Sequence, residues 1–155
     1  MKTAYRVLAY LIALEVVIQA AAIAFAMFGL AKWIGEGGVL DKATLESGSL
    51  NFTGVVGFPV HGINGQYLVP LIAILLLVVS FFAKVPRAVM WAGLVVALVA
   101  VQVFLGIFGH GIPALGLLHG LNAVVLFVVA VIAARRTRAT LVEPRATAPV
   151  GAGVV

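Results

Sequence analysis

The sequence contains no cysteine and few charged residues. Of its 155 residues, 10% are charged and 64% are hydrophobic. Without cysteine the chain has neither disulfides nor thiolate metal ligands. So small a charged fraction excludes a soluble domain, which needs polar groups to cover its surface. We therefore expect the lipid bilayer to be the solvent of this chain.

The sequence also lacks a basic patch with interleaved aromatic residues, which is typical of nucleic-acid-binding proteins. Its ten Lys and Arg residues, which give a net charge of +5, lie beside apolar segments instead. We expect no nucleic-acid partner. A cleaved signal peptide is not expected either, because the apolar run from about Val7 to Ile34 is too long for one.

Four long apolar windows predict four transmembrane helices. A span needs about 20 apolar residues to cross the hydrocarbon core. Windows of that kind cover about 5–34, 59–83, 87–109 and 112–134. Backbone polar groups cannot stay unpaired in lipid, and the alternation of barrel strands is absent, so each window is expected to be helical. The sequence thus predicts an all-α, integral membrane four-helix bundle over residues 1–134.

The segments outside the spans predict the topology. Residues 35–58 are rich in Gly, Ser and Thr and predict an aqueous outer loop, with a short helix near residues 41–46. Residues 135–155 are basic and then rich in Pro, Ala and Gly, which predicts a disordered cytoplasmic tail. Eight of the ten basic residues share a side with the termini, and only Lys32 and Lys42 lie on the other. We therefore expect a multi-pass protein of the cell membrane with both termini cytoplasmic.

The most informative pattern is an internal repeat. The segment His-Gly-Ile-Asn-Gly at 61–65 recurs as His-Gly-Leu-Asn-Ala at 119–123. Each copy lies in the outer part of an even-numbered span, and Gln19 and Gln102 lie at similar depths in the odd-numbered spans. We therefore expect a duplicated helical hairpin, with a pseudo-two-fold axis along the membrane normal.

The two histidines of the repeat are the candidate metal ligands. The second and fourth spans run in the same direction, so His61 and His119 should face a common axis in the outer leaflet. Two imidazoles so arranged can hold a haem iron by both axial positions, which implies haem b (heme b) as the cofactor. The other candidate cofactor-binding residues are the small and amide side chains of the repeat: Gly62, Asn64, Gly65, Gly120, Asn122 and Ala123.

The surroundings of the histidines fit this hypothesis with one disagreement. The small residues would leave room for a flat macrocycle, and the asparagine amides could either orient an imidazole or meet a polar group of the cofactor. However, the interval from His61 to Lys84 is longer than the interval from His119 to Arg135. This unequal spacing predicts a depth difference of about 10 Å. A tilt, an extension past the membrane or a kink at Pro70 would have to absorb it.

Part of the chain resembles a known family. The run Gln-Val-Phe-Leu-Gly at 102–106, a Gly-Pro turn, and Leu-Leu-His-Gly-Leu-Asn-Ala at 117–123 are similar to the second hairpin of one four-helix half of haem A synthase. The resemblance covers about residues 58–134 and implies axial haem ligation by His61 and His119. The chain corresponds to a single half, and Phe-Pro stands at 58–59 where the family has a Glu before its second-helix histidine. The synthase reaction is therefore not implied. The chain also resembles small four-helix membrane proteins of unassigned function from high-GC bacteria.

The patterns favour a small membrane b-type cytochrome with one haem near the outer leaflet. With both axial positions filled, the iron has no open site, so we expect electron transfer with a quinol or a redox partner protein, or haem handling, and no oxygenation. One alternative is a non-enzymatic accessory protein that packs on a larger complex or on copies of itself, with the histidines as interhelical hydrogen-bonding groups. Another is a proton or small-solute pathway through Glu15, the one acid inside a span. His110 is either a solvated turn residue or a neighbour of the haem edge.

Overall fold

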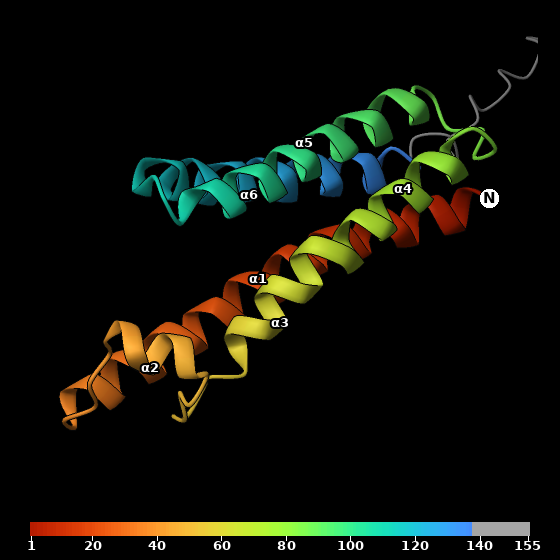
Figure 1. Cartoon of the computed structure of the whole chain (residues 1–155). Helices are drawn as coiled ribbons and strands as arrows, with labels where there is room; N and C mark the ends of the chain where they lie inside the picture. Colours follow the sequence, from red (N-terminus) through yellow and green to blue (C-terminus); the bar gives the residue numbers. More distant parts are fainter. Residues whose placement is uncertain (138–155) are drawn as a thin grey trace, which may run out of the picture.

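The computed structural model describes residues 1–137, and the regular structure of this part is entirely helical (Figure 1). Helix α1 spans Lys2–Gly35, and a short α2, Lys42–Ser47, lies in the loop that follows. The next long segment consists of α3 (Gly57–Ile63), the π-helix η1 (Asn64–Leu68) and α4 (Val69–Ser80). Helix α5 spans Ala88–Gly109, and α6 spans Pro113–Arg135.

Four helical units are long and apolar enough to cross a membrane: α1, the α3–η1–α4 segment, α5 and α6. The predicted all-α membrane four-helix bundle is thereby confirmed. The predicted spans differ from these units by at most three residues at either end. The short helix expected near residues 41–46 is α2. The predicted disorder of the tail concerns mainly residues 138–155, which lie outside the described residues.

Local sequence determines several helix ends. Asp41 caps α2, since its Oδ1 accepts hydrogen bonds from the backbone and side chain of Thr44, each at 2.7 Å, and these bonds lower the pKa of Asp41. Pro113 begins α6, where a missing N–H costs no helical hydrogen bond. The reversal between α4 and α5 is tight, because Lys84 and Arg87 both adopt left-handed backbone angles, with φ of 51° and 58°.

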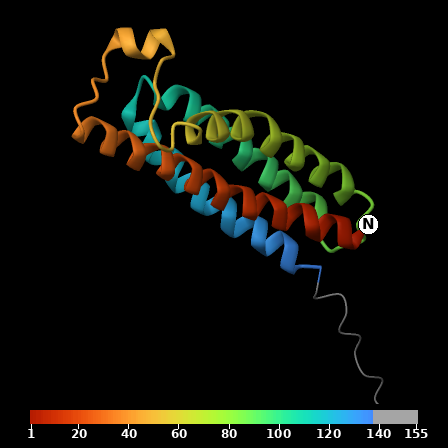
Figure 2. The same ribbon diagram turned by 90° about the horizontal axis from the view of Figure 1, so that it is seen from below.

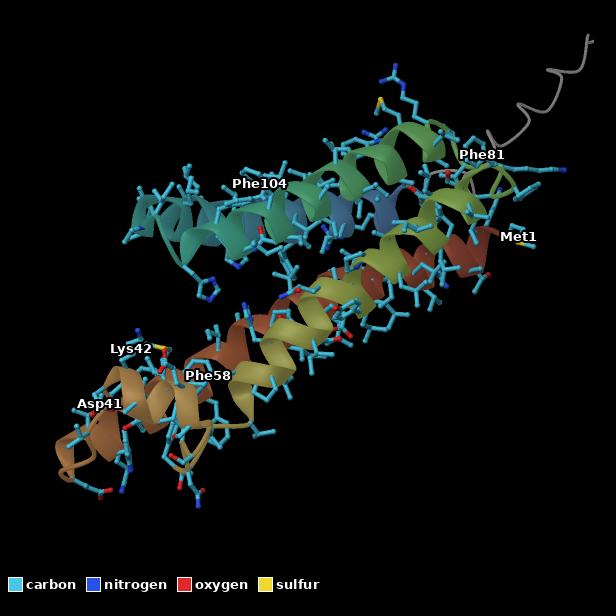
Figure 3. The ribbon with its side chains drawn as sticks, in the orientation of Figure 1. Met1, Asp41, Lys42, Phe58, Phe81 and Phe104 are labelled. Carbon is cyan, nitrogen blue, oxygen red and sulfur yellow. The ribbon has the colours of Figure 1, made fainter. Side chains whose placement is uncertain are left out.

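The bundle has two different ends. The N-terminus, the turn between α4 and α5, and the last turn of α6 lie together at what we call the terminal end (Figure 1). Helix α2 and the connection between α5 and α6 lie at the opposite end, the loop end. In Figure 3, Met1 and Phe81 mark the terminal end, and Asp41 and Lys42 mark the loop end.

The buried core is concentrated in the terminal half. Helix α6 buries residues only from Leu126 onward. Tyr5 is fully buried and donates its hydroxyl to the Ala88 carbonyl at 3.3 Å, which ties the start of α1 to the start of α5. Small side chains let helix backbones approach closely in a membrane. Six alanines in the helices of this core are at most 1% exposed and fill this role: Ala9, Ala73, Ala92, Ala130, Ala133 and Ala134.

Toward the loop end the bundle separates into two hairpins (Figure 1). Helix α3 packs on α1, and α5 packs along α6, while contacts of α1 with α6 and of α4 with α5 join the hairpins. Figure 2 shows α1 running beside α6, in agreement with the contacts between these two helices. Helix α3 and the part of α6 nearest the loop end are therefore less enclosed than α4 and the rest of α6.

A π-helical turn interrupts the second span just before Pro70. Proline has no N–H for the carbonyl four residues back, and its ring presses on that turn of a regular helix. Here residues 64–68 form the wider π-turn, in which the Val69 N–H bonds to the Asn64 carbonyl, five residues back. The turn takes up one residue more than an α-helix would, which shortens the rise along this span.

Candidate functional site

His61 of α3 and His119 of α6 face each other where the two hairpins separate. Their ring centroids are 6.0 Å apart, and the ring planes are inclined by 63°. Both side chains are half-buried. The main packing partner of α3 is α1, and those of α6 are α5 and α1, so the paired rings bridge two helices that otherwise pack elsewhere. The two histidines of the repeat thus come together.

The depth difference expected from the sequence is absorbed by the end of α4 and by the π-turn. Helix α4 ends at Ser80 and α6 ends at Arg135. The helical interval 61–80 is therefore less than one turn longer than the interval 119–135. The π-turn takes up part of this excess, and the hairpins are inclined to each other (Figure 1). The rings can therefore meet although their spacings from the terminal end differ.

Each imidazole is fixed by a backbone carbonyl of its own hairpin. Nδ1 of His61 lies 3.1 Å from the Gln19 carbonyl oxygen, and Nδ1 of His119 lies 3.0 Å from that of Gln102. A carbonyl oxygen can only accept, so Nδ1 must carry the proton in both rings. In a neutral imidazole the lone pair is then on Nε2. Neither Nε2 makes a hydrogen bond within residues 1–137.

The repeat asparagines bond to polar groups of the odd-numbered helices. Asn64 donates Nδ2 to Glu15 Oε2 at 2.6 Å, and Asn122 donates Nδ2 to Gln102 Oε1 at 2.6 Å and to the Leu98 carbonyl at 3.0 Å. Both amide nitrogens are thus used within their hairpins, and neither bonds to an imidazole. Asn122 acts on the histidine indirectly, because it holds the glutamine whose carbonyl anchors His119.

The hydrogen bonds repeat as the sequence does. In the even-numbered spans, position 61 corresponds to 119 and position 64 to 122. In the odd-numbered spans, position 19 corresponds to 102 and position 15 to 98. The contacts of one half therefore have counterparts in the other, as a duplicated hairpin predicts. One chemical difference stands out, since Glu15 in the first half corresponds to Leu98 in the second.

The glycines of the site have two different roles. A Cβ at Gly62 or Gly120 would meet no atom within 4 Å outside its own helix turn, so each of these positions faces open space. Gly65 is packed instead, because a Cβ there would lie 3.2 Å from Gln19 Oε1. Its counterpart Ala123 is half-buried. Gly106 makes room for His119, since a Cβ at that position would lie 3.2 Å from the ring.

The sequence did not indicate that backbone carbonyls anchor the histidines. Its only signal was the matching position of Gln19 and Gln102, whose side chains drew attention while their carbonyl groups make the contact. His110 is exposed and its Nδ1 lies 3.3 Å from the Ile107 carbonyl of its own helix, so it is a turn residue in this structure. Within residues 1–137 no group of three or more His, Asp and Glu side chains is placed to hold a metal ion.

One surface groove lies beside α3 and η1, and neither histidine of the pair lines it. It has a volume of about 450 Å³, and its lining residues run from Val56, just before α3, to Leu68 of η1. Neither α5 nor α6 contributes to it, so it runs along one helix instead of between the hairpins.

In comparisons with protein-family models, curated proteins and solved structures, no significant match to the chain was found.

Proposed function

We propose that the protein is a small membrane b-type cytochrome, in which His61 and His119 bind one haem b by its two axial positions. The observation that carries the proposal is the pair of facing rings, 6.0 Å apart, each anchored through Nδ1 to a backbone carbonyl. An anchoring bond of this kind is usual for metal-ligating histidine, because it fixes the tautomer and raises the basicity of the other nitrogen.

The separation of the rings suits two ligands on opposite sides of one metal. Metal–imidazole bonds of roughly 2.0–2.1 Å put the two ligating nitrogens about 4 Å apart. A centroid separation of 6.0 Å accommodates that distance, because each ring centroid lies behind its nitrogen.

The number of ligands favours haem over a metal ion held by the protein alone. Non-haem sites use three or four protein ligands, and the described chain offers two. A haem brings four equatorial nitrogens of its own, so two histidines complete its coordination. Gly62 and Gly120 carry no side chain next to the ligands that could hinder a flat ring. When bound, the haem supplies reversible one-electron transfer between ferric and ferrous iron.

The accessory-protein alternative uses the histidines only as hydrogen-bonding groups. Such bonds exist, but each joins helices of the same hairpin through Nδ1 and leaves Nε2 unused. Across the hairpins the rings approach without a hydrogen bond between them, which is a poor way to join helices and a good way to bind a metal. Electron transfer or haem handling is therefore the function we favour, with a quinol or a redox partner protein as electron donor or acceptor.

Charge supports a topology with both termini cytoplasmic in the cell membrane. Lys84, Arg87, Arg135 and Arg136 lie at the terminal end with the N-terminal basic residues, and that end is expected to face the cytoplasm. At the loop end, Lys32 and Lys42 are each paired with a glutamate four residues on, Glu36 and Glu46. The haem would then lie in the outer half of the bilayer.

The test is a reduced-minus-oxidised absorption spectrum of the purified protein in detergent, after haem supplementation. We expect a low-spin b-type spectrum that is lost in both His61→Ala and His119→Ala. The matched control is His110→Ala, which removes the third histidine and should leave the spectrum unchanged. A colourless protein, or a spectrum that survives both substitutions, would overturn the proposal.

A further inference from the structure

The two halves of the site differ in one ionisable group. Glu15 is the only acidic residue in the described membrane-spanning helices, and its counterpart in the second half is Leu98. An ionisable side chain within the bilayer is costly, and it is usually functional where it occurs. The duplication therefore supplies an internal comparison, since the second half holds its histidine in the same way without a carboxyl group.

Glu15 is linked to the surroundings of His61 in two ways. It is half-buried and accepts a hydrogen bond from Asn64, which is three residues from His61. It also lies one helical turn before Gln19, whose carbonyl anchors His61. Its other oxygen, Oε1, makes no hydrogen bond within residues 1–137.

The carboxyl group changes the hydrogen bonding of the first half. In the second half, Asn122 donates to the side chain of Gln102. In the first half, Asn64 donates to Glu15 instead, and Gln19 Nε2 is left buried without a partner in the described chain. A buried amide without an acceptor is uncommon. The first half thus has an unused donor one helical turn from an acid.

No basic side chain pairs with Glu15 in the part of the chain that the structure describes. Helix α1 packs on the α3–η1–α4 segment and on α6. The α3–η1–α4 segment contributes His61 and Tyr67 as titratable groups, and Tyr67 is 71% exposed. Helix α6 contributes His119, and its Arg135 lies at the terminal end. On α1 itself the basic residues are Lys2, Arg6 and Lys32, and each is more than two turns from Glu15 along the helix. A haem held by the two histidines would add the positive charge of its iron to these surroundings.

We propose that Glu15 is the redox-linked proton acceptor of this site, a role that rests on the proposed haem. The Glu15 carboxylate takes up one proton from water when the iron gains one electron from a quinol or a chemical reductant and passes from ferric to ferrous. Reoxidation releases both. The reason is electrostatic: reduction removes one positive charge near the carboxylate, and in a medium of low dielectric constant this favours its neutral form.

The test is a potentiometric titration of the haem-loaded protein at a series of pH values. We expect the midpoint potential to fall as the pH rises, with a slope of at most about 59 mV per pH unit, because for one electron a tenfold change corresponds to 59 mV. In Glu15→Gln this slope should decrease to the part that the carboxyl groups of the haem itself contribute. Glu46→Gln, which removes an exposed carboxyl of α2, is the matched control and should keep the slope.

A flat dependence in the wild-type protein, or a wild-type slope in Glu15→Gln, would overturn the inference. The repeat offers a rescue: Glu15→Leu combined with Leu98→Glu moves the acid to Asn122, and the slope should return. If Glu15→Gln does not bind haem, the variant that combines Glu15→Leu with Leu98→Glu provides the test. A midpoint potential that does not depend on pH in that variant would overturn the proposal. In the wild type, infrared difference spectra should gain a carboxylic-acid band on reduction, and its absence would also overturn it.

These outcomes are separable from failure of the proposed function. A wild-type protein without a b-type spectrum would overturn the haem site itself. A normal low-spin spectrum with a pH-independent potential would leave the haem site standing and remove only the role of Glu15.

Discussion

At the scale of single residues, the two nitrogens of each imidazole in the site differ in their hydrogen bonding. Nδ1 is used by the fold, because it bonds to a carbonyl of the neighbouring helix in the same hairpin. Nε2 is left with a lone pair that no described group uses. A histidine that served only to join helices would gain more from a partner on each nitrogen, since unpaired polar groups are costly in lipid.

The open space beside the histidines gives a prediction for Gly62. We expect Gly62→Leu to fold normally, because no atom lies within 4 Å of the position of its Cβ. Haem binding should weaken at least tenfold, since the larger side chain would fill the space proposed for the macrocycle. The measurement is a haem titration followed by absorption. The control is Gly93→Leu on α5, where a Cβ also meets nothing within 4 Å, in the terminal half away from the histidines.

Equal haem affinity in Gly62→Leu and the unsubstituted protein would contradict the idea that the macrocycle occupies this space. It would not contradict the histidine pair itself, which rests on the ring separation and on the two bonds to backbone carbonyls.

At the scale of helices, the position of His61 depends on how closely α3 approaches α1. Gly57 is buried where a Cβ would run into the Ala22 carbonyl, and Gly29 of α1 lies in the same way against the Thr53 carbonyl. Such contacts between backbones are typical of membrane helix pairs. They bring α3 near enough to α1 for the imidazole to reach Gln19.

Gly57→Ala should therefore damage the site from a distance. The methyl group would push α3 away from α1, and we expect a loss of about 1–3 kcal/mol in the free energy of unfolding, as for other overpacked contacts. Haem affinity should fall at least tenfold as well, because the bond from His61 to the Gln19 carbonyl would lengthen. The measurements are unfolding by denaturant in mixed micelles and a haem titration.

The matched control is Gly116→Ala on α6, where an added Cβ meets nothing within 4 Å. It should change neither quantity appreciably. If Gly57→Ala also leaves both unchanged, the close approach of the two helices is not what positions His61.

The sequence predicted the helices well and the approach of the histidines less well. Long apolar windows bounded by charged or glycine-rich segments predicted all four spans within three residues, because in lipid the helix is nearly the only choice. The apparent depth difference between His61 and His119 arose because the interval to Lys84 includes a π-turn and a non-helical reversal after Ser80. Neither has a periodicity signature, so residue counting overstated the rise.

At the scale of the whole molecule, the bundle is closed at one end and open at the other. Alanine-rich contacts close the terminal half, whereas α6 buries no residue before Leu126. The repeat predicted from sequence that the two halves would face each other, but not that their backbones would separate beside the histidines, because separation depends on packing between distant segments.

The orientation in the membrane gives the last prediction, and the lack of cysteine makes it direct to test. Single cysteines at Thr3 and Ala43, both exposed, mark the terminal end and the loop end. If basic residues hold the terminal end in the cytoplasm, a membrane-impermeant thiol reagent should label Ala43→Cys in intact cells and Thr3→Cys only after permeabilisation. The cysteine-free protein is the background control. The reverse pattern would put the histidine pair in the inner half of the bilayer, and an electron donor or acceptor on the cytoplasmic side would then be nearest to it.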